Sequence, residues 1–147
     1  MTLIAIGCDH GGYILKQKIM DYYRGLEFKD FGTMSEESVD FPDFAIPVAE
    51  SVASGECEKG ILLCRSGIGM SIAANKVKGI RCALCYSTAT AISAKRHNNA
   101  NVIAVGADEL DFEEVKNIID FWLKEEFLGG KYQLRLDKIS EYEERMR

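Results

Sequence analysis

Short apolar runs alternate with amphipathic stretches along the whole chain. Short runs of six or seven residues predict five strands, at residues 3–8, 27–32, 59–64, 80–86 and 100–106, and all of these except 27–32 are mostly apolar. Between and after them, apolar residues recur at helical spacing at 13–26, 43–56, 69–77, 88–99, 111–127 and 131–147. In the first of these helices Ile14, Ile19 and Tyr22 fall on or near one face. Pro47 is placed near the first turn of the second helix.

The order of these elements predicts the fold class. Apolar strands that alternate with helices are typical of a parallel sheet whose two faces are both covered. We therefore expect a single α/β domain over residues 1–147. Its architecture is a three-layer α/β/α sandwich with a five-stranded parallel, Rossmann-like sheet and an additional C-terminal helix. In such folds ligands bind beyond the carboxyl ends of the strands.

Composition narrows the class of protein. The chain has 147 residues, of which 47% are hydrophobic and 28% charged, and its net charge is -5. This balance favours neither nucleic acid nor a membrane surface as a partner. The N-terminal run lacks the basic start of a signal peptide, and no apolar run reaches the length of a membrane helix. We therefore expect a cytoplasmic protein.

Five cysteines are present, at positions 8, 57, 64, 82 and 85. Cys82 and Cys85 have the C-x-x-C spacing, but we expect them in one strand, where residues three apart face opposite sides. A disulfide or redox pair is therefore not expected there. Except for Cys64, these thiols are interpreted as reduced and buried.

The segment "CRSGIGMS" follows the strand at 59–64. Gly67 and Gly69 allow backbone N–H groups to converge, and the next helix adds its positive N-terminal end, so the loop is suited to an anion. Met70 stands where a cysteine phosphatase has arginine, and the nucleotide-binding G-K-[ST] is absent. The anion is then one that develops during reaction, such as an enediolate oxygen, with Cys64 as base. The alternative is a cysteine buried at a strand end.

The segment "GCDHGG" also follows a strand and begins a helix. It is not the G-x-G-x-x-G of dinucleotide-binding proteins, so a nicotinamide cofactor is not expected. Asp9 and His10 are two polar, proton-transferring side chains at a strand end, which favours a site. The alternative is a polar turn in which Asp9 caps the helix.

Two further candidates come from elsewhere in the chain. His97 lies between the helix at 88–99 and the last strand, at the opposite end of the sheet from Cys64. If both act on one small substrate, they must come from different chains; the alternative is an ordinary helix-end histidine. Lys131 and Arg135 are four residues apart and share a helix face, which suits a phosphate clamp or a solvated basic surface equally.

Together, "GCDHGG", "ESVDFPDFA", "GILLCRSGIGMSIAANK", "GIRCAL", "HNNANVIAVGA" and "GGKYQLR" resemble the ribose-5-phosphate isomerase B family, which includes galactose-6-phosphate isomerase subunits. The match covers nearly the whole chain. The resemblance implies interconversion of an aldose phosphate and a ketose phosphate, here ribose 5-phosphate and ribulose 5-phosphate, through a cis-enediolate. It implies neither a metal nor an organic cofactor. Family members are dimers, some paired into tetramers, with sites shared between subunits.

The resemblance also implies a role for each matching residue. Cys64 is the base between C1 and C2, and His97 is the acid that assists ring opening, with Asp9 beside it. The remaining matches bind substrate: the anion hole at Ser66, Gly67, Ile68 and Gly69; the sugar contact Asn98; and the phosphate contacts His10, Lys131 and Arg135.

This sequence departs from the family pattern at several of these positions. Arg65 replaces a usual glycine, and Asp108 replaces a usual phosphate-binding arginine. We hypothesise that Arg65 takes over part of the lost binding role and that Asp108 pairs with it. Two other functions stay open, an isomerase for another sugar phosphate and a non-catalytic sugar-phosphate-binding protein. The second is disfavoured because Asp9, Cys64 and His97 are retained.

Overall fold

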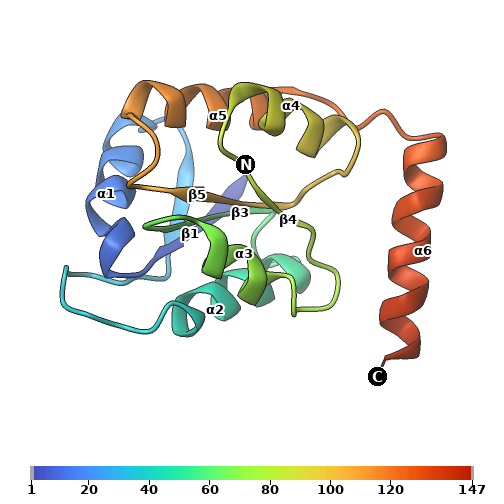
Figure 1. The fold of residues 1–147 in the computed structure, drawn as a ribbon, viewed down its shortest axis with the longest axis horizontal. Coiled ribbons are helices and arrows are strands. Elements are labelled where there is room, and N and C mark those ends of the chain that lie inside the picture. Colours follow the sequence, from blue (N-terminus) through green and yellow to red (C-terminus); the bar gives the residue numbers. More distant parts are fainter. Residues whose placement is uncertain (1, 147) are drawn as a thin grey trace.

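A computed structural model describes residues 2–146 and shows one sheet between two layers of helices, with a further helix at the C-terminal side (Figure 1). The strands are β1 (Leu3–Cys8), β2 (Glu27–Asp30), β3 (Lys59–Cys64), β4 (Cys82–Leu84) and β5 (Val102–Gly106). The helices are the short 3-10 helix η1 (His10–Gly12), α1 (Tyr13–Tyr22), α2 (Pro42–Ala53), α3 (Ile68–Ala74), α4 (Thr88–Arg96), α5 (Phe112–Lys124) and α6 (Lys131–Arg145). The predicted α/β fold is confirmed.

The sheet is parallel, with strand order β2-β1-β3-β5-β4. Its register aligns the carboxyl ends of the three central strands, because Cys8 lies opposite Leu63 and Cys64 lies opposite Gly106. The segments that follow β1, β3 and β5 therefore leave the sheet side by side. These are the segments in which the sequence placed Asp9, Cys64 and Asp108.

The core has two halves, one on each face of the sheet. Side chains alternate between them with the period of two that a strand imposes: Ile4 and Ile6 pack on one side and Ala5 on the other. The first half lies under α1, α4 and α5, and the second under α2 and α3 (Figure 1). Cys64 belongs to the second half, which places its side chain on the α3 side of the sheet.

The predicted strand at 80–86 is wrong in its length. The Ile80 N–H donates to the Val77 carbonyl in a turn, and the Cys82 N–H donates to the Asn75 side chain, so ladder pairing covers only Cys82–Leu84. This strand is at the sheet edge and pairs with β5 alone. Cys82 and Cys85 nevertheless pack in different core halves, as predicted.

Two details of the helices also differ from expectation. Ile14 and Tyr22 are about half exposed, whereas Leu15, Lys16 and Ile19 form the buried side of α1. On the buried side Lys16, despite its charge, pairs with Asp30 and with the Thr33 carbonyl. Helix α2 begins at Pro42, so Pro47 lies in its interior instead of near the first turn.

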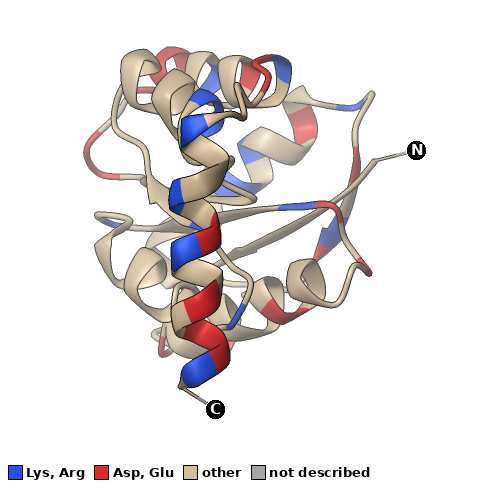
Figure 2. Ribbon diagram, turned by 90° about the vertical axis from the view of Figure 1, so that its right-hand side faces the viewer, with Lys and Arg blue, Asp and Glu red and all other residues tan. Residues whose placement is uncertain are grey.

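Helix α6 stands apart from the three layers (Figure 1). Leu136 is its one buried residue within the described chain, while Leu134, Ile139 and Tyr142 are more than half exposed. Figure 2 shows basic residues on its first half and mainly acidic residues on its second half. No helix among residues 2–146 combines the length and the apolar character that crossing a membrane requires.

Candidate active site

The loop after β3 folds back over the sulfur of Cys64. The Gly67 N–H donates to Cys64 Sγ at 3.1 Å. Cys64 is buried, with 6% of the residue exposed. Gly67 has φ of +80°, and a Cβ there would lie 2.7 Å from the Leu84 side chain. Both the backbone conformation and the lack of space therefore require glycine at the turn that brings the N–H to the sulfur.

Helix α3 begins directly after this turn, at Ile68. The Ile68 N–H donates to Ser66 Oγ at 3.2 Å, so the serine hydroxyl closes the loop on itself. The loop also sits tightly on β5, because a Cβ on Gly106 would lie 2.7 Å from the Ser66 backbone. The result is a short, well-held turn that presents the amino end of a helix beside Cys64.

Pairing between β3 and β5 continues past the strands. The Ala107 N–H donates to the Cys64 carbonyl at 2.8 Å, and the Asp108 N–H donates to the Arg65 carbonyl at 3.0 Å. Asp108 therefore lies beside Arg65, and Arg65 Nη1 is 3.3 Å from Asp108 Oδ2. The hypothesised pairing is confirmed, within one chain. The stem of Arg65 also covers Gly11, where a Cβ would be 2.4 Å from Arg65 Cγ.

Asp9 caps the turn that follows β1. Its Oδ1 accepts N–H donations from Gly11 at 2.9 Å and Gly12 at 3.2 Å, and the residue is 8% exposed. The capping interpretation of Asp9 is therefore confirmed. Capping occupies one carboxylate oxygen and does not exclude a second role at a strand end that adjoins Cys64.

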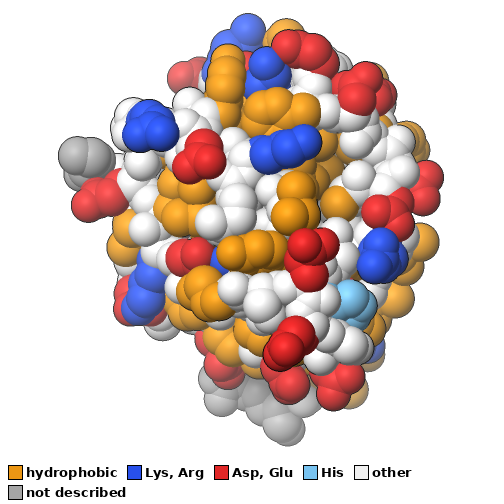
Figure 3. Space-filling view, turned by 90° about the vertical axis from the view of Figure 1, so that its left-hand side faces the viewer, with side chains coloured by type: hydrophobic (Ala, Val, Ile, Leu, Met, Phe, Trp, Pro, Cys, Tyr) orange, Lys and Arg blue, Asp and Glu red, His pale blue; other side chains and the backbone are white. Residues whose placement is uncertain are grey.

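His10 is oriented by a distant segment. Its Nδ1 accepts the Val39 N–H at 3.2 Å, which leaves the proton of a neutral ring on Nε2. The same segment brings Phe41 over the anion loop, where a Cβ on Gly69 would lie 2.9 Å from the aromatic ring. The chain between β2 and α2 therefore covers both candidate loops. Figure 3 views this side of the molecule, where apolar, basic and acidic side chains are interspersed.

The remaining candidates gather around Tyr132, which sequence reasoning missed. His97 ends α4, and its ring stacks on Tyr132 with centroids 4.5 Å apart and an interplanar angle of 15°. Lys131 Nζ and Arg135 Cζ lie 5.3 and 5.6 Å from the same ring. Tyr132 lies inside the "GGKYQLR" motif between the two basic residues, which is the signal that could have identified it.

Asn98 lies beside this second cluster. It lines a cavity of about 520 Å³ that β4 and α6 enclose between them, together with Leu136, Ile139 and Tyr142. The exposed apolar side chains of α6 thus face an incompletely filled space. The cavity is on the side of the molecule away from Cys64.

Each chain therefore carries two separate groups of candidates. One follows the carboxyl ends of the strands, with Asp9, His10 and the Cys64 loop; the other, around His97, precedes β5. The five residues of β5 correspond to roughly 17 Å. As the sequence predicted, Cys64 and His97 of one chain lie at opposite ends of the sheet.

Three of the other thiols are poorly suited to act as a base. Burial raises the pKa of Cys8 to about 11 and those of Cys82 and Cys85 to about 12. Thiols with such pKa values are poor sources of thiolate at neutral pH. Within residues 2–146 no three His, Cys, Asp or Glu side chains are grouped as metal ligands.

Comparison with known proteins identifies the family of this chain. The family model described as Ribose/Galactose Isomerase matches residues 4–139. Ribose-5-phosphate isomerase B of Escherichia coli (strain K12) is 44% identical over 147 residues, with 99% of each chain covered. The chain belongs to the ribose/galactose isomerase family.

Other relatives in this family bear on fold and substrate. The structure titled as ribose-5-phosphate isomerase B of Clostridium thermocellum matches with a TM-score of 0.97 and 49% identity, covering 99% of this chain and 100% of that one. D-erythrulose-4-phosphate isomerase of Pectobacterium atrosepticum is 44% identical, covering 97% of this chain and 96% of its own. Members with different sugar phosphates in their names are thus about equally similar to this chain.

Proposed function

We propose that this protein interconverts ribose 5-phosphate and ribulose 5-phosphate through a cis-enediolate, with Cys64 as the base. The observation that carries the proposal is the Cys64 sulfur, which accepts the Gly67 N–H at 3.1 Å at the start of the anion loop. It is supported by full-length similarity to proteins named ribose-5-phosphate isomerase B.

The reaction moves one proton between two carbons. The Cys64 thiolate removes the proton from C2 of the open-chain aldose, and the electron pair passes through the new C1–C2 double bond to the carbonyl oxygen O1. N–H groups of the loop stabilise the enediolate charge as it develops. The thiol then returns its proton to C1, and O2 becomes the ketone oxygen after a proton passes from O2 to O1. Cys64 ends as it began.

His97 is assigned to ring opening, where it donates a proton to the ring oxygen while the hydroxyl on C1 releases its proton to water. Its stack on Tyr132 holds the ring in one plane, which favours a defined direction of proton transfer. Asp9 is assigned a supporting place beside the reacting groups. Asn98 is assigned to a sugar hydroxyl.

The phosphate is assigned to His10, Lys131 and Arg135. His10 offers its Nε2 proton, since Nδ1 is occupied by Val39. Lys131 stands in the first turn of α6, where the helix dipole disfavours cations and no acidic residue is present, and Arg135 follows one turn later. These charges therefore do not stabilise the helix, and we assign a bound phosphate dianion as their counter-charge.

A complete site needs two chains. In a homodimer, Cys64 of one subunit would meet His97 of the partner subunit, which accounts for the distance between the two groups in one chain. Apolar side chains near the anion loop support a covering protomer, because Ile68, Ile72 and Tyr86 are each more than half exposed.

We further infer a cytoplasmic location, because a phosphate dianion does not cross a bilayer unaided.

A second candidate substrate is a shorter or differently configured sugar phosphate. Two observations support this second candidate. An Arg65–Asp108 pair lies next to the loop, and the chain is 44% identical to D-erythrulose-4-phosphate isomerase. Comparing kcat/KM for ribose 5-phosphate with that for D-erythrulose 4-phosphate decides between the two. The substrate with the higher value is the assigned one.

The base is tested with Cys64→Ala, and Cys57→Ala serves as the matched control. We expect the Cys64 variant to bind sugar phosphate but to lose turnover by about 10²–10⁴-fold, the usual contribution of general base catalysis. Cys57 is buried on the same core half and should be dispensable for turnover. A Cys64→Ala enzyme with the wild-type kcat would exclude this thiol as the base.

The shared site is tested by subunit exchange. Cys64→Ala and His97→Asn homodimers should each be inactive, and mixing them should restore activity, because every mixed dimer contains one site with both groups intact. Native mass spectrometry confirms that mixed dimers form. Continued inactivity despite exchange would place both groups in a site built by one chain.

A further inference from the structure

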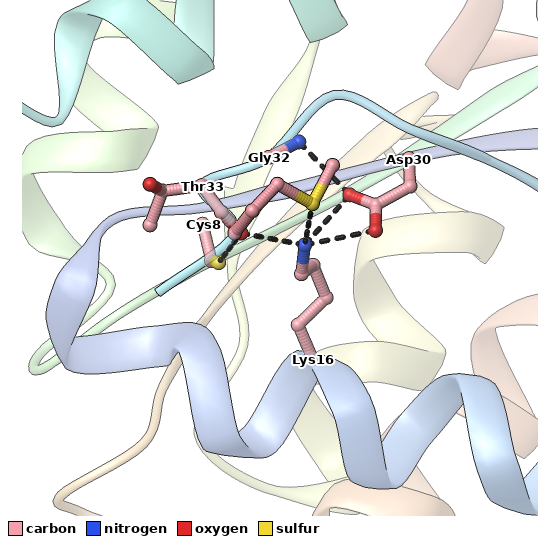
Figure 4. A network of polar contacts seen from close by, with 6 residues as sticks. Cys8, Lys16, Asp30, Gly32 and Thr33 are labelled. Carbon is pink, nitrogen blue, oxygen red and sulfur yellow. Dashed lines mark hydrogen bonds and ion pairs between the residues drawn. The ribbon is translucent and has the colours of Figure 1, made fainter. Parts of the chain in front are cut away.

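A buried lysine that the proposed reaction does not use lies beneath the site. Lys16 is on α1 and its side chain is 0% exposed. Its Nζ is 2.7 and 2.9 Å from the two carboxylate oxygens of Asp30 and 2.7 Å from the Thr33 carbonyl oxygen, with Met34 Sδ at 3.7 Å (Figure 4). An ammonium group at this depth is tolerated only when its N–H groups are paired, so the partners are held in place by the charge.

These partners form the turn that ends β2. Asp30 Oδ1 also accepts the Gly32 N–H at 2.8 Å. The turn is fastened to the end of β1, because the Cys8 N–H donates to the Gly32 carbonyl and the Thr33 N–H donates to the Cys8 carbonyl. Lys16 therefore joins three segments, namely α1, the 30–33 turn and the strand end that precedes Asp9.

The chain beyond this turn, residues 34–41, is the covering loop. It has no helix or strand before α2, and Met34 is 62% exposed. At its far end the Val39 N–H donates to His10 Nδ1, and Phe41 covers Gly69. The covering loop is thus anchored at its start by the Lys16 cluster and touches the candidate site at its end.

We propose that Lys16 is a positioning residue that keeps the covering loop on the site. By holding Thr33 and Asp30, it fixes where the loop starts, so that Val39 keeps His10 Nδ1 occupied and aims the Nε2 proton at the substrate phosphate. A buried ion pair is weak evidence for stability, since apolar residues of similar volume often serve a core as well. An apolar side chain would fill the same space but would not form the directional hydrogen bonds by which Lys16 holds the turn and the loop.

The role assigned to His10 rests on the proposed function, but the loop geometry does not. The test therefore measures both substrate binding and the position of the loop. Lys16→Met keeps an unbranched side chain of similar length, and Ile19→Ala is the control, because it removes buried packing from the same helix without touching the loop. We expect Lys16→Met to raise the KM for ribose 5-phosphate by about tenfold, the effect of one lost charge-assisted hydrogen bond, with kcat little changed. Ile19→Ala should lower the melting temperature and leave KM unchanged.

Nuclear magnetic resonance gives the readout that activity does not. In the wild type the Val39 amide should exchange slowly, and the His10 ring should show the Nε2-protonated tautomer at about pH 8, above the ordinary histidine pKa. Lys16→Met should accelerate Val39 exchange and mix the tautomers. Unchanged exchange and tautomer in Lys16→Met would overturn the proposal, whatever the activity.

A second variant covers the case in which Lys16→Met does not fold. Val39→Pro removes the N–H that His10 accepts and leaves the Lys16 cluster intact. It should reproduce the tenfold rise in KM, and a wild-type KM in this variant would also overturn the proposal. If the wild type fails to turn over ribose 5-phosphate, the proposed function falls, whereas the exchange and tautomer measurements still decide the role of Lys16.

Discussion

Arg65 and Asp108 form an ion pair at the surface of the candidate site, with side chains 64% and 52% exposed. Pairs this exposed contribute about 0–1 kcal/mol to stability, because water screens both charges. We therefore expect the pair to matter for binding more than for folding. It places a cation next to the anion loop and offsets a carboxylate that would otherwise repel a phosphate dianion.

The coupling of these two residues is testable through KM. Arg65→Gly should raise the KM for sugar phosphate, because it removes a cation and leaves Asp108 unpaired. Arg65→Gly with Asp108→Arg should recover much of that loss, since a cation returns to the same surface. Asp108→Arg alone completes the double-mutant cycle.

The cycle has a clear negative outcome. Residues in direct contact show interaction energies of about 0.5–3 kcal/mol, whereas independent residues give additive effects. Additive changes in KM across the four proteins would refute the coupling. An unchanged KM in Arg65→Gly would show that its charge does not act on the substrate.

Helix α6 is attached near its two ends, and Leu136 is its one buried residue among those described. At its start, the Leu128 N–H donates to the Arg96 carbonyl, and His97 stacks on Tyr132. At its end, the Gly79 N–H donates to Glu143, and Lys78 pairs with Glu144. Because these attachments are local, a single change at the helix start should affect His97 without unfolding the domain.

The stacked ring of Tyr132 is the attachment to test. Tyr132→Ala frees His97 and should lower kcat by up to about tenfold, since aromatic stacking contributes about 0.5–1.5 kcal/mol. Tyr132→Phe keeps the ring and should behave as wild type. Steady-state kinetics and melting temperatures of both variants give the comparison. Equal loss of kcat in the two variants would assign the effect to the hydroxyl and not to the stack.

Three thiols with raised pKa values make the stability of the whole molecule depend on pH in the alkaline range. Burial raises the pKa of Cys8 from 9.0 to about 11 and those of Cys82 and Cys85 from 9.0 to about 12. Above pH 9.0 the unfolded chain releases thiol protons that the folded chain retains. The stabilisation is therefore fully present below pH 9.0 and is lost as the pH rises through about 11 for Cys8 and about 12 for Cys82 and Cys85.

Urea unfolding across this window measures the effect. The free energy of unfolding of the wild type should fall as the pH rises above 9.0, with each raised thiol contributing up to about 1.4 kcal/mol per pH unit. Replacing Cys8, Cys82 and Cys85 by alanine should flatten this dependence, while Cys64→Ala serves as the single-thiol control. An equally steep fall in the triple variant would assign the alkaline sensitivity to other groups.

The order of the elements and the fold class follow from the pattern of apolar residues along the chain. Apolar strands must be covered on both faces, and this alone implies helices on two sides of a parallel sheet. Because all strands then run the same way, the positions of Cys64 and His97 along the chain already placed them at opposite ends of the sheet. The motifs were sufficient to identify the family. Comparison with the family pattern also showed that Arg65 replaces a glycine and that Asp108 replaces an arginine.

Only the tertiary structure decided which side chains meet. Lys16 is three residues from Ile19 on the buried side of α1, yet its burial depends on Asp30 and Thr33, which reach it only after β2 has paired with β1. The stack of Tyr132 on His97 likewise joins residues that are distant in sequence. Local pattern reports which face of an element is apolar, whereas register and packing decide what that face contacts.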